Sequence, residues 1–161
     1  MKRLNWSVNT LIGRILFYMD ALDYTIVEIL SENAKLGTKE VAEQIGLTVT
    51  PTYERIKRLE KSGVIAGYKA EVNHRLLGKM LHVHCYVTLN AHERSVIDNF
   101  EEKVVKLNEV EQAYHLAGEV DYVLVIRVED MDHYHEFIKN RLSAIDQIGN
   151  VKSNFVMRTI K

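Results

Sequence analysis

The side chains best suited to binding another molecule lie in a short basic stretch of the chain, residues 48–62. This stretch contains four Lys and Arg residues against two acids, Glu54 and Glu60. Guanidinium and ammonium groups neutralise phosphates, whereas hydroxyl and aromatic side chains can reach base edges in a DNA groove. We therefore predict contacts with double-stranded DNA from the following residues: Thr48, Thr50, Pro51, Thr52, Tyr53, Arg55, Lys57 and Arg58.

The residues around this stretch, 38–62, are expected to form two short helices joined by a tight turn. Thr38 can cap the first helix through its hydroxyl group, and Gly46 can adopt the left-handed conformation that ends it. Thr48 is the expected N-cap of the second helix, and Gly63 is its expected end. Two helices connected in this way form a helix-turn-helix, whose second helix can enter the major groove of DNA.

The second helix is expected to turn Ile56 and Leu59 inward, because they lie three residues apart. That orientation leaves six residues for solvent or DNA: Thr50, Thr52, Tyr53, Arg55, Lys57 and Arg58. The alternative is an ordinary helical hairpin with a solvated basic face, since residues 20–68 hold six Lys and Arg against eight Asp and Glu, a net charge of −2. One such helix would bind DNA weakly, so the pattern favours a dimer that presents two.

A further helix is predicted just before this pair, over residues 21–33, where apolar residues recur at helical spacing. The three helices would form a DNA-binding unit over residues 19–72. Residues 64–72 are expected to be extended, and residues 73–79 are turn-like and mark a linker.

The remainder of the chain, residues 80–161, has the pattern of a sheet with two helices. Strands are expected over residues 81–89, 110–117, 121–128 and 151–160, and helices over residues 93–107 and 131–145. The order βαββαβ gives a ferredoxin-like antiparallel sheet with both helices on one face. The predicted fold class is therefore α+β, with a helix-turn-helix domain followed by a ferredoxin-like domain.

The third expected strand suggests a partner for the sheet. Both alternating sets of side chains are apolar in residues 122–128, apart from Arg127. A sheet with helices on one face should show polar residues on the other. We therefore expect the same sheet of a second subunit to cover that face in a symmetric dimer.

Length and composition set broad limits. The 161 residues suffice for two small domains, and the net charge of −1 indicates no particular partner. A single cysteine, Cys85, rules out an internal disulfide and is consistent with a reducing cytoplasm. No apolar run reaches the ~20 residues that a membrane span needs, so no membrane association is expected. Residues 1–18 are either a basic arm that touches DNA or a partner, or an extension before a natural start at Met19.

The sequence contains little that indicates a metal site or a catalytic site. His82 and His84 lie two residues apart on one face of a strand, which is acceptable geometry for a metal. The alternative is that both histidines line a subunit contact or its solvent edge, and no metal site is expected. The sequence has no nucleophile motif, no Gly-rich phosphate loop and no paired carboxylates, so no enzymatic activity is predicted.

Several motifs, in this order, resemble those of the Lrp/AsnC family of transcriptional regulators, also called feast/famine proteins. They are residues 22–23, the helix-turn-helix above, and residues 59–68, 118–122 and 151–154. The resemblance covers residues 19–161. Within the family, residues 50–55 look closer to the leucine-responsive branch.

The resemblance implies a winged helix-turn-helix domain for DNA and a C-terminal domain that joins subunits into a dimer or an octamer. It also implies a small-molecule effector, an amino acid or a related metabolite, and no cofactor. By position, the effector-binding residues would be Gly118, Asp121 and Tyr122. Gly118 allows close approach of backbone, and Asp121 could pair with an α-ammonium group. The alternative is that Gly118 makes a tight turn that Asp121 caps.

Two other functions stay open from the sequence. Some proteins of this two-domain architecture resemble haem-pathway decarboxylases that act on a tetrapyrrole, and His115 lies beside the expected pocket. A nucleoid-like architectural protein would bind DNA with little sequence preference.

Overall fold

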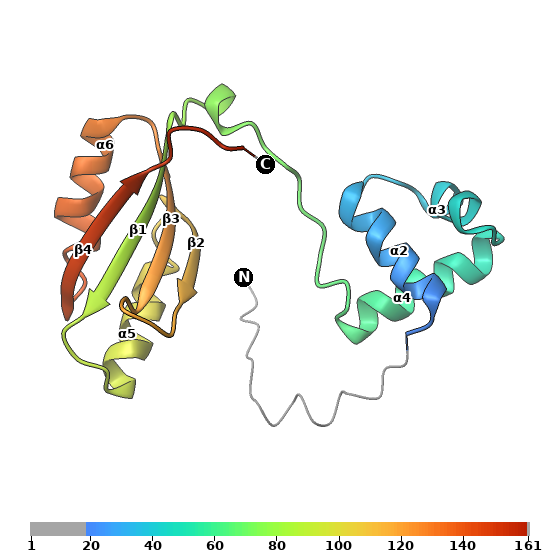
Figure 1. Cartoon of the computed structure of the whole chain (residues 1–161), viewed down its shortest axis with the longest axis horizontal. Coiled ribbons are helices and arrows are strands. Elements are labelled where there is room, and N and C mark those ends of the chain that lie inside the picture. Colours follow the sequence, from blue (N-terminus) through green and yellow to red (C-terminus); the bar gives the residue numbers. More distant parts are fainter. Residues whose placement is uncertain (1–18, 161) are drawn as a thin grey trace. The chain divides into compact units, whose positions relative to one another are not determined.

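The computed structural model describes residues 19–160, and the chain divides into two compact units between Glu71 and Val72 (Figure 1). The two interpretations of residues 1–18 lie outside the described residues. Among the residues that are described, no helix is long and apolar enough to cross a membrane.

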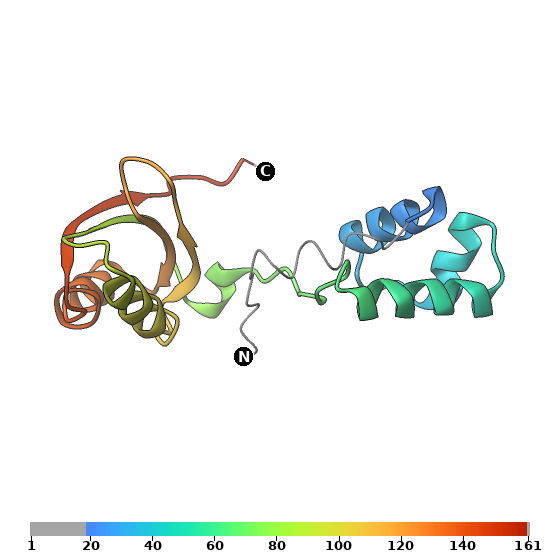
Figure 2. The same ribbon diagram turned by 90° about the horizontal axis from the view of Figure 1, so that it is seen from below.

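The first unit consists of three helices: α2 (Ala21–Glu32), α3 (Thr38–Ile45) and α4 (Val49–Ser62). Figure 2 shows α4 running beneath the other two. A small apolar core holds them together, made of Ile26, Leu30, Val41, Ile56 and Leu59. Since all three helices contribute to this core, the predicted arrangement of three helices is confirmed.

The segment after α4 leaves the helix through Gly63, whose φ of 81° is left-handed. The amide of Ile65 donates to the carbonyl of Leu59, 3.1 Å away, and returns the chain toward the core. Residues 66–73 then continue without sheet pairing, and a short 3-10 helix, η1 (His74–Leu77), follows. All the strands among the described residues belong to the second unit.

The second unit is a four-stranded sheet with helices on one face (Figure 2). Its elements are β1 (Leu81–Leu89), α5 (Arg94–Val104), β2 (Val110–His115), β3 (Tyr122–Val128), α6 (Met131–Glu136), the π-helical turn η2 (Phe137–Leu142) and β4 (Ile148–Phe155). The strand order is β2-β3-β1-β4, and every neighbouring pair is antiparallel. The predicted ferredoxin-like sheet is therefore confirmed.

The main core lies between the sheet and the helices. Residues of β1 and β3 alternate into it, together with Phe100 from α5 and Phe137 from η2: Val83, Cys85, Val87, Leu89, Leu124, Ile126 and Val128. Phe100 and Phe137 expose 0% and 1% of their surface, and rings of this size contribute a large share of the buried apolar area.

The last strand differs from its predicted bounds, residues 151–160. β4 runs from Ile148 to Phe155 because its register follows β1, in which Val83 pairs with Phe155 and Leu89 with Ile148. One further hydrogen bond, from the Val156 amide to the His82 carbonyl at 2.8 Å, ends the pairing. The chain beyond therefore has no strand partner among the described residues.

The outer face of the sheet, opposite the helices, carries an apolar centre. Val125 on β3 exposes 8% of its surface, and Val123 is half-buried beside Tyr86 of β1. Tyr114 on β2, which pairs with Val123, is 49% exposed. This face matches the expectation from residues 122–128 that both sides of the third strand are apolar.

We predict that Cys85 resists alkylation in the folded protein. Its side chain is fully buried in the core, and burial raises the pKa of the thiol to about 11. At pH 8 about one molecule in a thousand would then carry the reactive thiolate. Mass spectrometry after iodoacetamide treatment should show no adduct in the native protein and a complete adduct in denaturant. Rapid native labelling would contradict this placement.

Candidate DNA interface and effector region

The turn between α3 and α4 has the geometry of a helix-turn-helix. Gly46 ends α3 with a left-handed φ of 70°, and Thr48 is the N-cap of α4, as predicted. The predicted cap of α3 was wrong: Gly37 is the N-cap, and Thr38 is the first helical residue. The Glu40 carboxylate accepts from the Gly37 amide at 2.7 Å, and this bond sets the start of the helix.

The N-cap and the first three turns of α4 present most of the predicted DNA-binding side chains to solvent. Tyr53 and Val49 each expose 47% of their surface. The exposed members of the predicted set are Thr48, Thr50, Pro51, Tyr53, Lys57 and Arg58. Small, hydroxyl-bearing and basic side chains of this kind suit a DNA groove, although the exposed acid Glu54 lies among them.

Thr52 does not belong to this surface, contrary to its predicted exposure. Its side chain is fully buried, and its hydroxyl donates to the Thr48 carbonyl at 2.9 Å. Positions 52, 56 and 59 are spaced by four and three residues, so Thr52 shares the inward face of Ile56 and Leu59. Thr52 therefore positions the first turn of α4 from inside.

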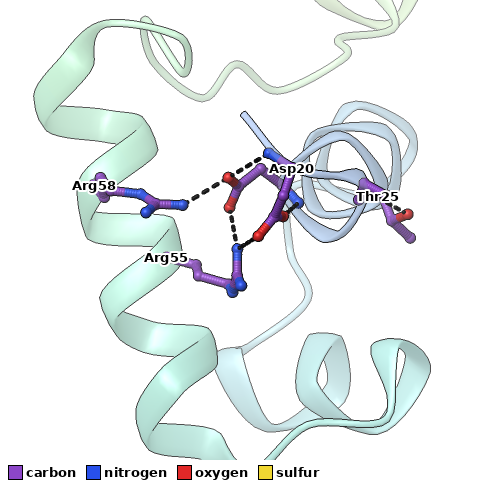
Figure 3. A network of polar contacts seen from close by, with 6 residues as sticks. Asp20, Thr25, Arg55 and Arg58 are labelled. Atoms are coloured by element: carbon purple, nitrogen blue, oxygen red, sulfur yellow. Dashed lines mark hydrogen bonds and ion pairs between the residues drawn. The ribbon is translucent and has the colours of Figure 1, made fainter. Parts of the chain in front are cut away.

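Arg55 is also drawn away from the exposed surface. One of its guanidinium nitrogens lies 2.7 Å from an oxygen of Asp20 and 2.8 Å from an oxygen of Asp23, at the start of α2. Only 24% of the Arg55 side chain is exposed. Figure 3 shows Arg55 and Arg58 reaching from α4 toward the start of α2, where Asp20 lies. The expectation that Arg55 is left free for solvent was wrong, and its contact with DNA stays a prediction.

Asp23 is the centre of this network, which we call the acid clamp (Asp20, Asp23, Arg55 and Arg58). Its carboxylate is fully buried, yet it accepts from Arg55, from Arg58 at 2.6 Å and from the Asp20 amide at 3.1 Å. The Asp20 side chain in turn accepts from the Asp23 amide at 2.9 Å, which completes a capping box. A buried charge is tolerated only when paired in this way.

The hydrogen bonds and ion pairs of the clamp shift the pKa of Asp20 and that of Arg55 in opposite directions. The backbone amide of Asp23, and next the Arg55 guanidinium, lower the pKa of Asp20. Hydrogen bonds to Asp20 and Asp23 raise the pKa of Arg55. Both groups therefore stay charged at neutral pH, and the ion pairs persist there.

The other end of the basic surface is held within α4 itself. The Lys57 ammonium lies 2.8 Å from Glu60 and 5.6 Å from the Tyr53 ring centroid. Hydrogen bonding to Glu60 raises the pKa of Lys57, and Lys57 lowers the pKa of Glu60. Lys57 remains half-exposed, so it combines a fixed charge with access to solvent.

The three expected effector residues lie at the turn from β2 to β3 and at the first residue of β3. One Asp121 oxygen accepts from the Leu89 amide at 2.7 Å, and the other lies 2.8 Å from the His92 ring. The Leu89 amide, and next the His92 ring, lower the pKa of Asp121. Tyr122 is 2% exposed and donates to Glu101 at 3.1 Å. Beside Gly118 there is open space: apart from its chain neighbours, no heavy atom of residues 19–160 lies within 4 Å of the place that a Cβ would occupy.

The histidines weighed as metal ligands lie on the outer face of the sheet. The His82 and His84 rings are 5.0 Å apart and edge to face. Burial, and next the charge of Arg127, lower the pKa of His82, so its ring is neutral at pH 7. In the described part of the chain, no three His, Cys, Asp or Glu residues are grouped as a metal site.

Both units of the chain match families of known proteins. Residues 19–66 match a family model described as winged helix-turn-helix DNA-binding, and residues 83–161 match the Lrp/AsnC ligand binding domain. The chain is 34% identical to the leucine-responsive regulatory protein of Haemophilus influenzae, over 89% of this chain and 86% of that protein. It is 30% identical to the Bkd operon transcriptional regulator of Pseudomonas aeruginosa, over 88% and 93% of the two chains.

Solved structures of transcriptional regulators also resemble this chain. A transcriptional regulator from Neisseria meningitidis in complex with L-Met superposes with a TM-score of 0.85 at 28% identity, over 89% of this chain and 93% of that one. An AsnC family regulator from Agrobacterium tumefaciens gives a TM-score of 0.83 at 34% identity, with the same coverage. The fold and the exposed recognition helix thus define a DNA-binding transcriptional regulator. The chain belongs to the Lrp/AsnC family.

Sequence reasoning missed the role of Asp23, although a signal was present. Asp20 and Asp23 are three residues apart directly before an apolar helical pattern, which is a capping-box spacing. The spacing predicts the start of α2. The pairing with Arg55 and Arg58 joins residues 32 and 35 positions apart and depends on the tertiary packing of the two helices.

We predict that Asp23→Asn loosens α2 and α4 without affecting the second unit. The amide keeps the size of the carboxylate but removes the charge that two arginines share. Because those arginines are partly exposed, we expect a loss of roughly 1–3 kcal/mol in local stability. Hydrogen exchange should show faster exchange at amides of α2 and α4 only.

Glu28→Gln is the matched control, since Glu28 is an exposed acid on the same helix. It should leave exchange unchanged. Equal exchange in Asp23→Asn and the control would show that the clamp does not hold the helices together.

Proposed function

We propose that this regulator binds specific DNA sites as a dimer, with one α4 from each subunit in successive major grooves, and that an amino acid controls its occupancy of promoters. The observation that carries the proposal is the exposed first half of α4. It presents Thr50, Pro51 and Tyr53 to solvent, with Lys57 and Arg58 behind them. Short side chains at the start of the helix suit base edges, and the cations suit phosphates.

The case for two helices is electrostatic. Residues 20–68 carry a net charge of −2, so the charge of one helix-turn-helix supplies little DNA affinity. Arg55 is committed to the acid clamp, which reduces the available cations further. Two helices on one DNA would double the phosphate contacts and double the bases read.

The outer face of the sheet supports the dimer. Val125 and Val123 of β3 lie there beside Tyr86 and Tyr114, with no helix of the same unit covering them. A second copy of the same face would bury these residues around a two-fold axis. We propose the dimer as the basic assembly, and an octamer as the larger one that the family resemblance implies.

The effector proposal rests on the relatives. The Neisseria meningitidis regulator forms a complex with L-Met. For this chain we propose the turn of residues 118–122, where the backbone beside Gly118 is open. Both Asp121 oxygens and the Tyr122 hydroxyl already have partners, so these two residues would shape the turn, and backbone amides would contact the ligand.

The effector would control promoter occupancy through thermodynamic linkage between ligand binding and assembly. An effector that binds one assembly or one spacing of α4 helices better than another shifts the population toward it, and promoter occupancy changes with that population. This function places the protein with the DNA, and we propose the cytoplasm as its location.

We predict that footprinting upstream of its own gene will show protected sites at intervals of one or more helical turns, and that one amino acid will strengthen or abolish them. Arg58→Ala should weaken protection at all sequences alike if Arg58 contacts phosphate, whereas Thr50→Ala should alter sequence preference.

Three results would contradict parts of the proposal. No protection at low salt would exclude DNA binding, and a Soret band on adding haem would then favour the tetrapyrrole alternative. Uniform protection along the DNA would favour an architectural protein. Unchanged affinity in both Arg55→Ala and Arg58→Ala would show that α4 is not in the groove.

A further inference from the structure

A second polar site lies at the opposite end of the β2–β3 hairpin from Gly118. It is a cavity of about 260 Å³ that includes Glu109, just before β2, and Arg127, near the end of β3. His115 pairs with Tyr122 at the Gly118 end, and Val110 pairs with Ile126 at this end. Five residues of strand, roughly 16 Å, therefore separate this cavity from the Gly118 turn.

Glu109 is the unusual residue of this cavity. It is 7% exposed, and one carboxylate oxygen accepts from Arg141 at 2.5 Å, with the His133 ring 3.6 Å away. The other oxygen is buried and has no hydrogen-bond partner among the described residues. A buried carboxylate oxygen without a donor is costly, so this one is suited to a donor that a ligand brings.

Cations surround the same cavity. Lys79 and Arg141 line it, and Arg127 does so while its guanidinium also pairs with Glu111 at 3.2 Å. The Arg141 side chain is 42% exposed and can turn toward a ligand. The site thus offers a deep acceptor of hydrogen bonds and a more open group of positively charged donors.

We propose that this cavity binds a small zwitterion, an α-amino acid, independently of the Gly118 turn. The ammonium group donates to the unpartnered oxygen of Glu109, and the carboxylate accepts from Arg141 and Lys79. Arg141 keeps its hydrogen bond to the first Glu109 oxygen and donates to the ligand carboxylate through its other guanidinium N–H groups. Both Glu109 oxygens then have donors, and a zwitterion leaves the net charge of the site unchanged.

Simpler ligands fit less well. An anion without an ammonium group would leave the Glu109 oxygen unpartnered and would face Glu129, which also lines the cavity. A cation without a carboxylate would face Arg141 and Lys79. The volume is just below the 300–1,000 Å³ or so typical of drug-sized ligands, so the ligand is small.

The test is calorimetric titration of the full-length protein with L-leucine, L-methionine, L-alanine, L-serine and glycine. The strongest binder is then compared with two analogues (half molecules), one without the carboxylate and one without the ammonium group. For L-leucine these are 3-methylbutylamine and 4-methylpentanoate. We expect the amino acid to bind and neither half to do so detectably. Glu109→Gln and Arg141→Met should each weaken binding about tenfold or more, because each removes a hydrogen bond to a charged group.

Controls separate this site from the proposed effector turn. Arg94→Gln changes an arginine outside the cavity whose side chain is 94% exposed, and should leave affinity unchanged. Circular dichroism checks the fold of each variant, and Lys79→Met at the rim replaces Glu109→Gln if the latter fails to fold.

Three outcomes would overturn the inference. They are no binding of any of the five amino acids, equal binding of one half molecule, or affinity that survives the cavity variants. Loss of binding in Asp121→Asn but not in the cavity variants would assign the ligand to the Gly118 turn. That result would reject this site and leave the proposed function intact.

Discussion

The DNA-binding unit depends on the ion pairs and hydrogen bonds of the buried Asp23 carboxylate. It lies in the first turn of α2 and receives hydrogen bonds from two arginines of α4 as well as from the Asp20 amide. The apolar core of this unit is small, so it holds the helices together but sets their relative angle weakly. Directed charge-assisted hydrogen bonds supply that angle, because they tolerate little displacement.

The clamp also determines which side chains of α4 remain for DNA. Arg55 and the buried Thr52 serve the inside of the unit, while Thr50, Pro51 and Tyr53 stay outside. Arg58 serves both purposes: it pairs with Asp23, yet 48% of its side chain is exposed. The proposed recognition surface and the stabilising ion pairs thus share one helix, and the proposed dimer of the second unit would bring two such helices together.

Much of this architecture could be predicted from local patterns. Alternation in residues 81–89, the apolar run of residues 122–128 and helical spacing in the first unit are consequences of which faces are buried, so they are visible in the sequence. Features that depend on residues distant in the sequence could not be predicted from local patterns. The bounds of β4 follow the register of β1, and the capture of Arg55 needs a carboxylate 32 residues away. Glu109 shows no local signal either, since Arg141 and the cavity reach it only in the folded sheet. The burial of Thr52, in contrast, could have been predicted from the sequence, because its spacing from Ile56 and Leu59 places it on the same inward face of the helix.

The central claim is that the clamp presents the first half of α4 to the DNA major groove. Photo-crosslinking tests it most directly, with p-benzoylphenylalanine placed at Tyr53 and, as a control, at Tyr68, which is equally exposed but lies beyond the end of α4. We expect position 53 to crosslink to bases of a bound site and position 68 not to do so. Bound DNA that crosslinks at position 68 but not at position 53 would contradict the claim.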